Sequence, residues 1–304
     1  MSIDFQGRVA IVTGAGGGLG RQHALALAKR GAKVLINDLG SAADGSGGSS
    51  AAARAVVQEI VEASGEALAN GASVTDAAAV QAMVQQALDV WGRVDILVNN
   101  AGILRDKSFA KMELADFQLV LDVHLMGAVN CSKAVWQHMI EQKYGRIVMT
   151  TSSTGLFGNF GQANYGAAKM ALVGLMQTLS LEGVKHDIRV NCLAPTAATR
   201  MTEGLLPQPV LDALKPEAVV PAMLLLASQQ APNRTILCAG AGTFAAAHVT
   251  MTSGVFLGIG DDVDERLAAQ LGDVIDREGS IVPENGGEQG RNEVTKAMAG
   301  IARD

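Results

Sequence analysis

Short apolar runs alternate with longer stretches of helical periodicity along most of the chain. Runs of four to eight apolar residues are typical of strands that are buried on both faces of a parallel sheet. The runs lie at residues 9–12, 33–38, 67–74, 94–98, 146–151, 188–193 and 235–238. With crossover helices between them, they predict an α/β, Rossmann-type, doubly wound fold with a seven-stranded parallel sheet.

The helical stretches show one irregularity. They lie at residues 21–30, 51–63, 76–90, 113–142, 163–183 and 217–227. The stretch over 113–142 is interrupted near Gly127 and contains His124, and a lone histidine in a helix is more often packed than catalytic. Beyond Gly260 the chain turns polar, with short helical segments near 266–271 and 293–301. We therefore expect a single domain over residues 1–260 and a short polar C-terminal extension over 261–304, with too few apolar residues for a core.

A glycine-rich loop follows the first predicted strand and precedes the first helix. It runs from Thr13 through Gly14, Gly18 and Gly20, with the spacing T-G-x-x-x-G-x-G. Glycines let the backbone approach a pyrophosphate, and the helix N-terminus supplies free N–H groups and a positive dipole end. Strand, loop and helix in this order predict a dinucleotide-binding, catalytic role for residues 1–260.

The second predicted strand ends on Asp38, about twenty residues after the loop. A carboxylate at this position accepts hydrogen bonds from an adenosine ribose and repels a 2′-phosphate. Gly17 and Leu39 stand where a basic residue would hold that phosphate. The strand end therefore favours NAD over NADP as cofactor.

Candidate catalytic residues follow the fifth predicted strand. Ser152 lies at the end of that strand, and Tyr165 and Lys169 are four residues apart on the next helix, so both side chains leave one helix face. A nearby ammonium favours the phenolate form of a tyrosine, and a serine hydroxyl can hold a substrate oxygen. The pattern therefore predicts a tyrosine that acts as a base near neutral pH and a serine that holds the substrate oxygen beside it.

Composition narrows the class of protein. The formal net charge of −6, with no run of basic residues, argues against a nucleic-acid surface. No stretch approaches 18 uninterrupted apolar residues, so no membrane span is expected, and residues 1–8 lack the apolar segment of a signal peptide. The three cysteines lack metal-ligand spacing, so we expect reduced core thiols and no metal. Together these features predict a cytoplasmic protein.

Over residues 7–242 these motifs together resemble the short-chain dehydrogenase/reductase family. The resemblance implies that Tyr165 is the general acid/base, that Lys169 lowers its pKa and holds the nicotinamide ribose, and that Ser152 binds the reacting oxygen. It places further residues beside the cofactor. These are Leu19, Ser73, Val74, Asn100, Ala101, Gly102, Pro195, Ala197 and Thr199. It also places subunit contacts on two long helices, at 115–139 and 163–181, which implies a homodimer or tetramer.

Within this family, the loop sequences are similar to those of one branch, the (3R)-hydroxyacyl-CoA dehydrogenases of type 2 multifunctional enzymes. The stretches that carry this likeness are 14–21, 37–40, 100–109, 143–146 and 158–164. His124 replaces the family's usual asparagine, which leaves open whether this candidate catalytic residue relays protons. Thr196 replaces the usual glycine after Pro195. The branch also implies a hydratase step in β-oxidation, which a separate enoyl-CoA hydratase would supply.

The favoured function is NAD-dependent oxidation of a (3R)-hydroxyacyl-CoA to the 3-oxoacyl-CoA, in the β-oxidation of fatty acids or sterol side chains. A 17β-type hydroxysteroid dehydrogenase, a 3-oxoacyl-carrier-protein reductase and a catalytically idle nucleotide-binding scaffold stay open as alternatives. The Gly/Ser-rich loop at 40–50, which we expect to be mobile, and the proline-rich segment at 196–214, expected as a lid, flank the predicted site.

Overall fold

Residues 9–247 are organised around one eight-stranded sheet. The computed structural model describes residues 3–48, 50–198 and 207–301. The strands are β1 (Val9–Thr13), β2 (Lys33–Asn37), β3 (Glu66–Asn70), β4 (Ile96–Asn99), β5 (Gly145–Thr150), β6 (Ile188–Thr196), β7 (Ile236–Gly240) and β8 (Thr243–Ala247). Their order in the sheet is β3-β2-β1-β4-β5-β6-β7-β8, and β1 to β7 pair in parallel. The order reverses between β1 and β4, which is the point where open α/β sheets bind ligands.

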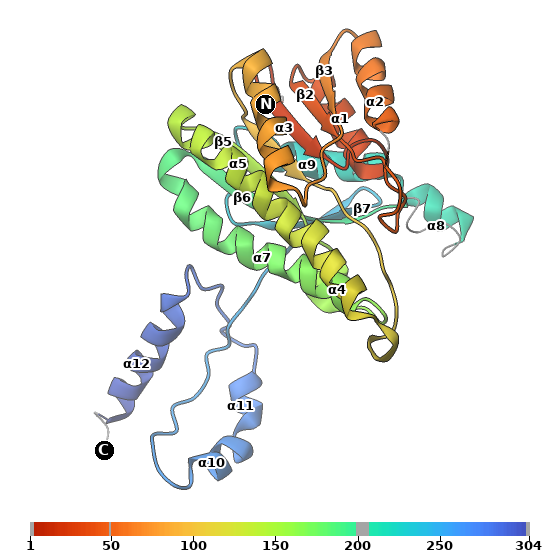
Figure 1. Ribbon diagram of the computed structural model, residues 1–304. Coiled ribbons are helices and arrows are strands. Elements are labelled where there is room, and N and C mark those ends of the chain that lie inside the picture. Colours follow the sequence, from red (N-terminus) through yellow and green to blue (C-terminus); the bar gives the residue numbers. More distant parts are fainter. Residues whose placement is uncertain (1–2, 49, 199–206, 302–304) are drawn as a thin grey trace. The chain divides into compact units, whose positions relative to one another are not determined.

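Helices cover both faces of this sheet (Figure 1). One face packs against α1 (Gly18–Lys29), α2 (Ala51–Glu62) and α9 (Val220–Ala227), which share one buried apolar cluster with the strands. The other face packs against α3 (Ala77–Trp91), α5 (Gly127–Gln142) and α7 (Ala163–Gly183). Burial on both faces explains why the strand sequences are continuous apolar runs. The predicted fold class is confirmed.

The predicted strands and helices are present, with small differences at their ends. One difference is at the third strand, which ends at Asn70 and not at Val74. The side chain of Asn37 donates hydrogen bonds to Asn70 Oδ1 (3.1 Å) and to the Ala72 carbonyl oxygen (2.9 Å), so the chain leaves the sheet there. Ser73 and Val74 therefore lie on a loop beyond the strand end.

An eighth strand, which the sequence analysis did not predict, extends the sheet beyond β7. Only Ala241 and Gly242 separate β7 from β8, and both have positive φ (48° and 73°). A two-residue turn with two left-handed residues matches the right-handed twist of a β-hairpin, so β8 returns antiparallel to β7. The sheet is thus mostly parallel with an antiparallel edge.

The long helical stretch before β5 is broken by a π-helical turn. It consists of α4 (Leu114–Leu121), the π-helical turn η2 (Asp122–Met126) and α5. Single π turns inside α-helices occur frequently at functional sites. His124 lies within this turn and is 4% exposed. At Gly127 a β-carbon would lie 2.7 Å from the Val74 side chain, so glycine allows the helix to approach the loop after β3.

Shorter elements connect these layers. They are the 3₁₀ helices η1 (Phe109–Lys111), η3 (Val184–His186) and η4 (Pro216–Val219), and the α-helices α6 (Ser153–Phe157) and α8 (Gln208–Ala213). The base of the proline-rich segment is closed by a hydrogen bond from Ala198 N–H to the Leu214 carbonyl oxygen (2.6 Å). The loop at 41–48 is anchored by the Ala43 carbonyl oxygen, which accepts from Leu104 N–H at 3.0 Å.

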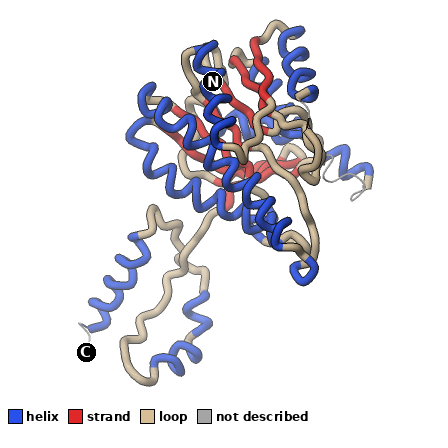
Figure 2. The backbone as a smooth tube through the Cα atoms, viewed as in Figure 1, coloured by secondary structure: helices blue, strands red, loops and turns tan. Residues whose placement is uncertain are grey.

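Residues 247–304 form a second compact unit, separate from residues 1–246. The predicted boundary lies later, at residue 260. The second unit contains α10 (Val263–Ala269), α11 (Leu271–Ile275) and α12 (Gly287–Ile301), and Figure 2 shows helix and loop in this part of the chain. None of its described residues is buried. In the described part of the chain, no helix is long and apolar enough to cross a membrane.

Candidate active site

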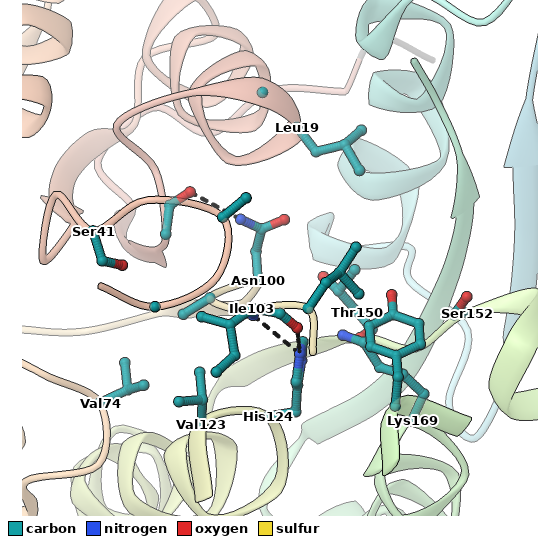
Figure 3. Close-up of a pocket in the computed structure, with 18 of the residues that line it drawn as sticks. Leu19, Ser41, Val74, Asn100, Ile103, Val123, His124, Thr150, Ser152 and Lys169 are labelled. Carbon is teal, nitrogen blue, oxygen red and sulfur yellow. Dashed lines mark hydrogen bonds between the residues drawn. The ribbon is translucent and has the colours of Figure 1, made fainter. Parts of the chain in front are cut away.

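A cavity of about 580 Å³ opens at the carboxyl ends of the strands, where the strand order reverses. Figure 3 shows side chains from the two halves of the sheet facing it. The predicted residues that line it are Gly14, Gly18, Leu19, Asp38, Ser73, Val74, Asn100, Ala101, Gly102, His124, Ser152, Tyr165, Lys169, Pro195 and Ala197. Gly20 packs behind the lining, and Thr199 lies outside the described residues.

The glycine loop is held against the end of β4. Asn100 Nδ2 donates to the carbonyl oxygens of Thr13 and Gly14, both at 3.0 Å. A β-carbon at Gly20 would collide with the Gly14 carbonyl oxygen and with the Asn100 side chain. The first turn of α1 carries no acidic side chain, so its N–H groups and positive dipole end are free to meet an anion. These features fit the pyrophosphate of a nicotinamide dinucleotide.

Asp38, which follows β2, is hydrogen-bonded to the glycine loop. Its carboxylate accepts hydrogen bonds from Gly16 N–H (2.7 Å) and Gly40 N–H (2.6 Å), and it lines the cavity. At Gly16 a β-carbon would lie 2.8 Å from Asp38 Cγ, so only glycine fits there. A carboxylate has about four acceptor positions, so these two bonds leave capacity for ribose hydroxyls.

Ser152 and Tyr165 meet in the half of the cavity formed by β5 and α7. Ser152 is the N-cap of α6, and its Oγ accepts from Thr154 N–H at 3.2 Å. Burial raises the pKa of Tyr165 above its usual value, a hydrogen bond with Ser152 lowers it, and the negative charge of Asp106 raises it. The net direction is upward, so a further positive charge is needed before the phenol can act as a base near neutral pH.

Lys169 can supply that positive charge. It is 3% exposed, its Nζ donates to the Thr150 carbonyl oxygen at 2.5 Å, and Nζ lies 5.4 Å from the centre of the Tyr165 ring. Burial lowers the pKa of Lys169 to about 7. The lysine is therefore poised between its charged and neutral forms close to neutral pH.

His124 packs edge-on against Tyr165, with ring centroids 5.2 Å apart and an interplanar angle of 87°. Its Nε2 lies 2.8 Å from the Ile103 carbonyl oxygen, the contact drawn in Figure 3. Its Nδ1 is buried and has no partner among the described residues. Burial, and then the charge of Lys169, hold the pKa of His124 well below its usual value, so the ring is neutral.

Residues 8–209 match the model of the family described as short chain dehydrogenase. The chain belongs to this family. It is therefore an oxidoreductase that acts on CH–OH groups with a nicotinamide cofactor.

Relatives of this dehydrogenase include parts of longer proteins. It is 50% identical to peroxisomal multifunctional enzyme A of Dictyostelium discoideum over 84% of this chain and 58% of that one. It is 52% identical to a short-chain type dehydrogenase/reductase of Mycobacterium tuberculosis over 78% of this chain and 83% of that one. The structure of full-length peroxisomal multifunctional enzyme type 2 from Drosophila melanogaster aligns with a TM-score of 0.82 and 36% identity, covering 98% of this chain and 50% of that one. The chain thus spans little more than half the length of these multifunctional relatives.

The cavity also includes polar residues that the sequence analysis missed. Among them are Asp106, Thr150, Thr154, Asn159 and Gln162. A local signal exists for two of them: Asp106 follows the predicted cofactor motif at 100–102, and Gln162 precedes Tyr165 by three residues. Within residues 3–48, 50–198 and 207–301, no group of three or more His, Cys, Asp or Glu side chains is arranged to hold a metal ion.

The buried lysine predicts a specific dependence of stability on pH. The pKa of Lys169 is about 7 in the folded protein against an ordinary value of 10.5. Between these values the unfolded chain binds a proton that the folded chain does not, so Lys169 destabilises the fold less as pH rises through this window. We expect the free energy of unfolding of Lys169→Met, relative to wild type, to fall steadily from about pH 7 to about pH 10.5.

Urea unfolding at several pH values measures this difference. Lys133 is exposed on α5, and Lys133→Met should show no such trend relative to wild type. A difference between Lys169→Met and wild type that stays constant with pH would contradict a lysine pKa near 7.

Proposed function

We propose that this dehydrogenase oxidises (3R)-hydroxyacyl-CoA thioesters to 3-oxoacyl-CoA in a β-oxidation pathway, with NAD as cofactor. The observation that carries the proposal is the meeting of Ser152, Tyr165 and Lys169 at one cavity beside the glycine loop. The proposal is supported by 50% identity to the Dictyostelium multifunctional enzyme and by 54% identity, over 74% of this chain, to the yeast peroxisomal hydratase-dehydrogenase-epimerase.

In the proposed mechanism the side chains handle the proton and hold the oxygen. Ser152 donates a hydrogen bond to the carbinol oxygen, and Tyr165, as phenolate, removes the carbinol proton. Lys169 stabilises that phenolate by its charge, which offsets the upward pull of burial on the pKa of Tyr165. A bound nicotinamide would supply the acceptor for the hydride that leaves the carbinol carbon. Asn100, Ala101, Gly102, Pro195 and Ala197 would position it, and Ser73 and Val74 would contact the adenine.

His124 takes a positioning role in this proposal. Its neutral ring is hydrogen-bonded to Ile103 and packs against Tyr165, so it fixes the loop after β4 relative to the reacting phenol. This contact replaces the side-chain role of the asparagine that is usual in the family. A proton relay through the backbone carbonyl of residue 124 remains compatible with the arrangement.

The substrate proposal predicts which epimer reacts. NADH should form from a (3R)-hydroxyacyl-CoA, and not at a comparable rate from the (3S)-epimer or from a free hydroxysteroid, because Ser152 and Tyr165 fix the face of the carbinol carbon.

Tyr165→Phe should lower turnover by about 10²- to 10⁴-fold, the usual contribution of a general acid–base group, while NAD binding persists.

The other tyrosine of the chain provides the control variant. The chain has two tyrosines, and the second, Tyr144, lies between the guanidinium groups of Arg8 and Arg146 outside the cavity. Tyr144→Phe should leave turnover near the wild-type value. Equal rates for both epimers, or activity on the steroid alone, would overturn the thioester assignment and favour the hydroxysteroid alternative.

Asp38 predicts the preference between the two nicotinamide cofactors. Its carboxylate already accepts from Gly16 and Gly40 at the cavity wall, where a 2′-phosphate would meet a like charge. Asp38→Ser should raise the ratio of kcat/KM for NADP to that for NAD by about tenfold or more. Asp44→Ser, a change of an exposed carboxylate on the following loop, is the matched control. A wild-type enzyme that used NADP better than NAD would contradict this part of the proposal.

We also propose a homodimer, with a tetramer as the alternative assembly. Apolar side chains are exposed on η2 and α7, notably Met126 (44%), Met170 (40%) and Leu181 (49%). Light scattering at micromolar concentration should give at least twice the chain mass of 31.4 kDa. Met170→Glu should weaken the assembly, whereas Val61→Glu, on the exposed side of α2, should not. A monomer mass for the wild type would contradict the proposal.

Two further expectations accompany this function. A separate enoyl-CoA hydratase would supply the hydroxyacyl substrate, because hydration of an enoyl thioester creates the 3-hydroxyl group. The cytoplasmic location stays a prediction, and the names of three multifunctional relatives, from Dictyostelium, yeast and Drosophila, include the word peroxisomal.

A further inference from the structure

Asp106 occupies a fixed position at the substrate side of the cavity. The Arg105 carbonyl oxygen accepts a hydrogen bond from the buried Asn164 side chain at 3.0 Å. On the other side, Lys107 N–H donates to the Gly161 carbonyl oxygen at 2.9 Å. The peptide groups before and after Asp106 are therefore tied to the segment that leads into Tyr165, and the position of Asp106 relative to the reacting phenol is set by the backbone.

The Asp106 side chain is held as well. Gln162 Oε1 accepts from the Thr154 hydroxyl (3.0 Å) and from Asn159 Nδ2 (2.9 Å), and these two bonds fix the orientation of the Gln162 amide. Gln162 Nε2 then donates to Asp106 Oδ2 at 2.7 Å. All four residues line the cavity together with Ser152. They form a polar wall, defined as Asp106, Thr154, Asn159 and Gln162, which ends in a carboxylate.

The carboxylate charge is not cancelled within the described residues. None of their ion pairs includes Asp106, whose one described side-chain partner is a neutral amide. The charge reaches the reaction centre, since it raises the pKa of the Tyr165 phenol in addition to the larger effect of burial. A substrate whose carbinol oxygen lies between Ser152 and Tyr165 therefore reacts in the negative field of Asp106.

We propose that Asp106 is a specificity-determining residue that selects substrates with an uncharged acyl group beside the carbinol, such as thioesters, over free 3-hydroxy carboxylates. The inference rests on the proposed function and extends it to the charge of the substrate. Thr154 connects the polar wall to Ser152, because its N–H donates to Ser152 Oγ at 3.2 Å, so a carboxylate one carbon from a carbinol held by Ser152 would face the charge of Asp106. Asp106 is exposed, and two like charges that line one cavity repel each other. A thioester carbonyl meets no such penalty. Rejection by a built-in repulsive group is a common route to specificity.

The test compares two substrates that differ in this charge. The values of kcat/KM are measured with saturating NAD for (3R)-hydroxybutanoate and for its N-acetylcysteamine thioester. Wild type should prefer the thioester. Asp106→Asn should raise the ratio of kcat/KM for the acid to that for the thioester by about tenfold, because it removes the repulsion. Asparagine retains a side-chain oxygen that can accept from Gln162, so the polar wall keeps its hydrogen bonds.

Two control variants separate charge from packing. Asp106→Glu keeps the charge and should leave the ratio near the wild-type value. Asp89→Asn changes another exposed carboxylate that accepts from a glutamine amide, that of Gln85 at 2.7 Å, but lies on α3 away from the cavity lining. It should leave the ratio unchanged.

The pH profile gives a second readout. Asp106 raises the pKa of Tyr165, so Asp106→Asn should move the limb of kcat/KM for the thioester that reports Tyr165 to lower pH. Tyr165 also faces Lys169 on its own helix and His124 on η2, and both are unchanged in every variant. Asp89→Asn should not move the limb.

The outcomes distinguish this inference from the function on which it rests. A wild-type enzyme that turns over neither compound sinks the proposed function and the inference with it. Turnover of the thioester with the same ratio in wild type and Asp106→Asn overturns the charge selection alone. A ratio that changes equally in Asp106→Glu, or that changes without a shift of the pH limb, assigns the effect to packing and also overturns it.

Discussion

The hydrogen bonds that join the ends of β1 and β4 are the constraint on which the site depends. The Thr13 hydroxyl accepts from the backbone N–H groups of Asn100 (3.0 Å) and Ala101 (3.1 Å) and contacts the Val98 carbonyl oxygen at 3.3 Å. The Asn100 side chain returns two bonds to the carbonyl oxygens of Thr13 and Gly14. Strand order reverses between these strands, so their connecting loops diverge to opposite faces and leave the cavity between them. β1 and β4 pair directly in the sheet, and these bonds continue that connection into the glycine loop and the loop after β4.

In the proposed mechanism, the charge of Lys169 serves the chemistry at a cost in stability. A buried lysine with a neutral hydrogen-bond partner costs stability near neutral pH, as its pKa of about 7 indicates. The same burial places an ammonium in a medium of low dielectric constant, where its effect on a neighbouring phenol is greater than in water. The surrounding strands, whose apolar residues are buried on both faces, offset the cost.

The side chains around Tyr165 can pack together because the neighbouring backbone leaves space for them. A β-carbon at Gly102 would lie 2.9 Å from His124 Nδ1, so the glycine after β4 is what admits the histidine ring. The π turn places that ring against Tyr165, and Gln162 of the polar wall holds the Asp106 carboxylate. The phenol therefore lies among a neutral ring, a poised ammonium and a fixed carboxylate, each held by a different element.

Local sequence was sufficient for the fold and for much of the site. Apolar runs predicted the seven parallel strands because both faces of each are covered, and strand–glycine–helix order predicted the position of Gly14 and Asp38 at the carboxyl edge. Helical spacing was enough to pair Tyr165 with Lys169. Features that depend on distant segments were decided only by the tertiary structure. Thr154, Gln162 and Asp106 form one wall because the Asn164 side chain donates to the Arg105 carbonyl oxygen and Lys107 N–H donates to the Gly161 carbonyl oxygen, across more than fifty positions of the sequence. The pKa of Lys169 and the neutrality of His124 likewise follow from burial, which no short stretch of sequence encodes.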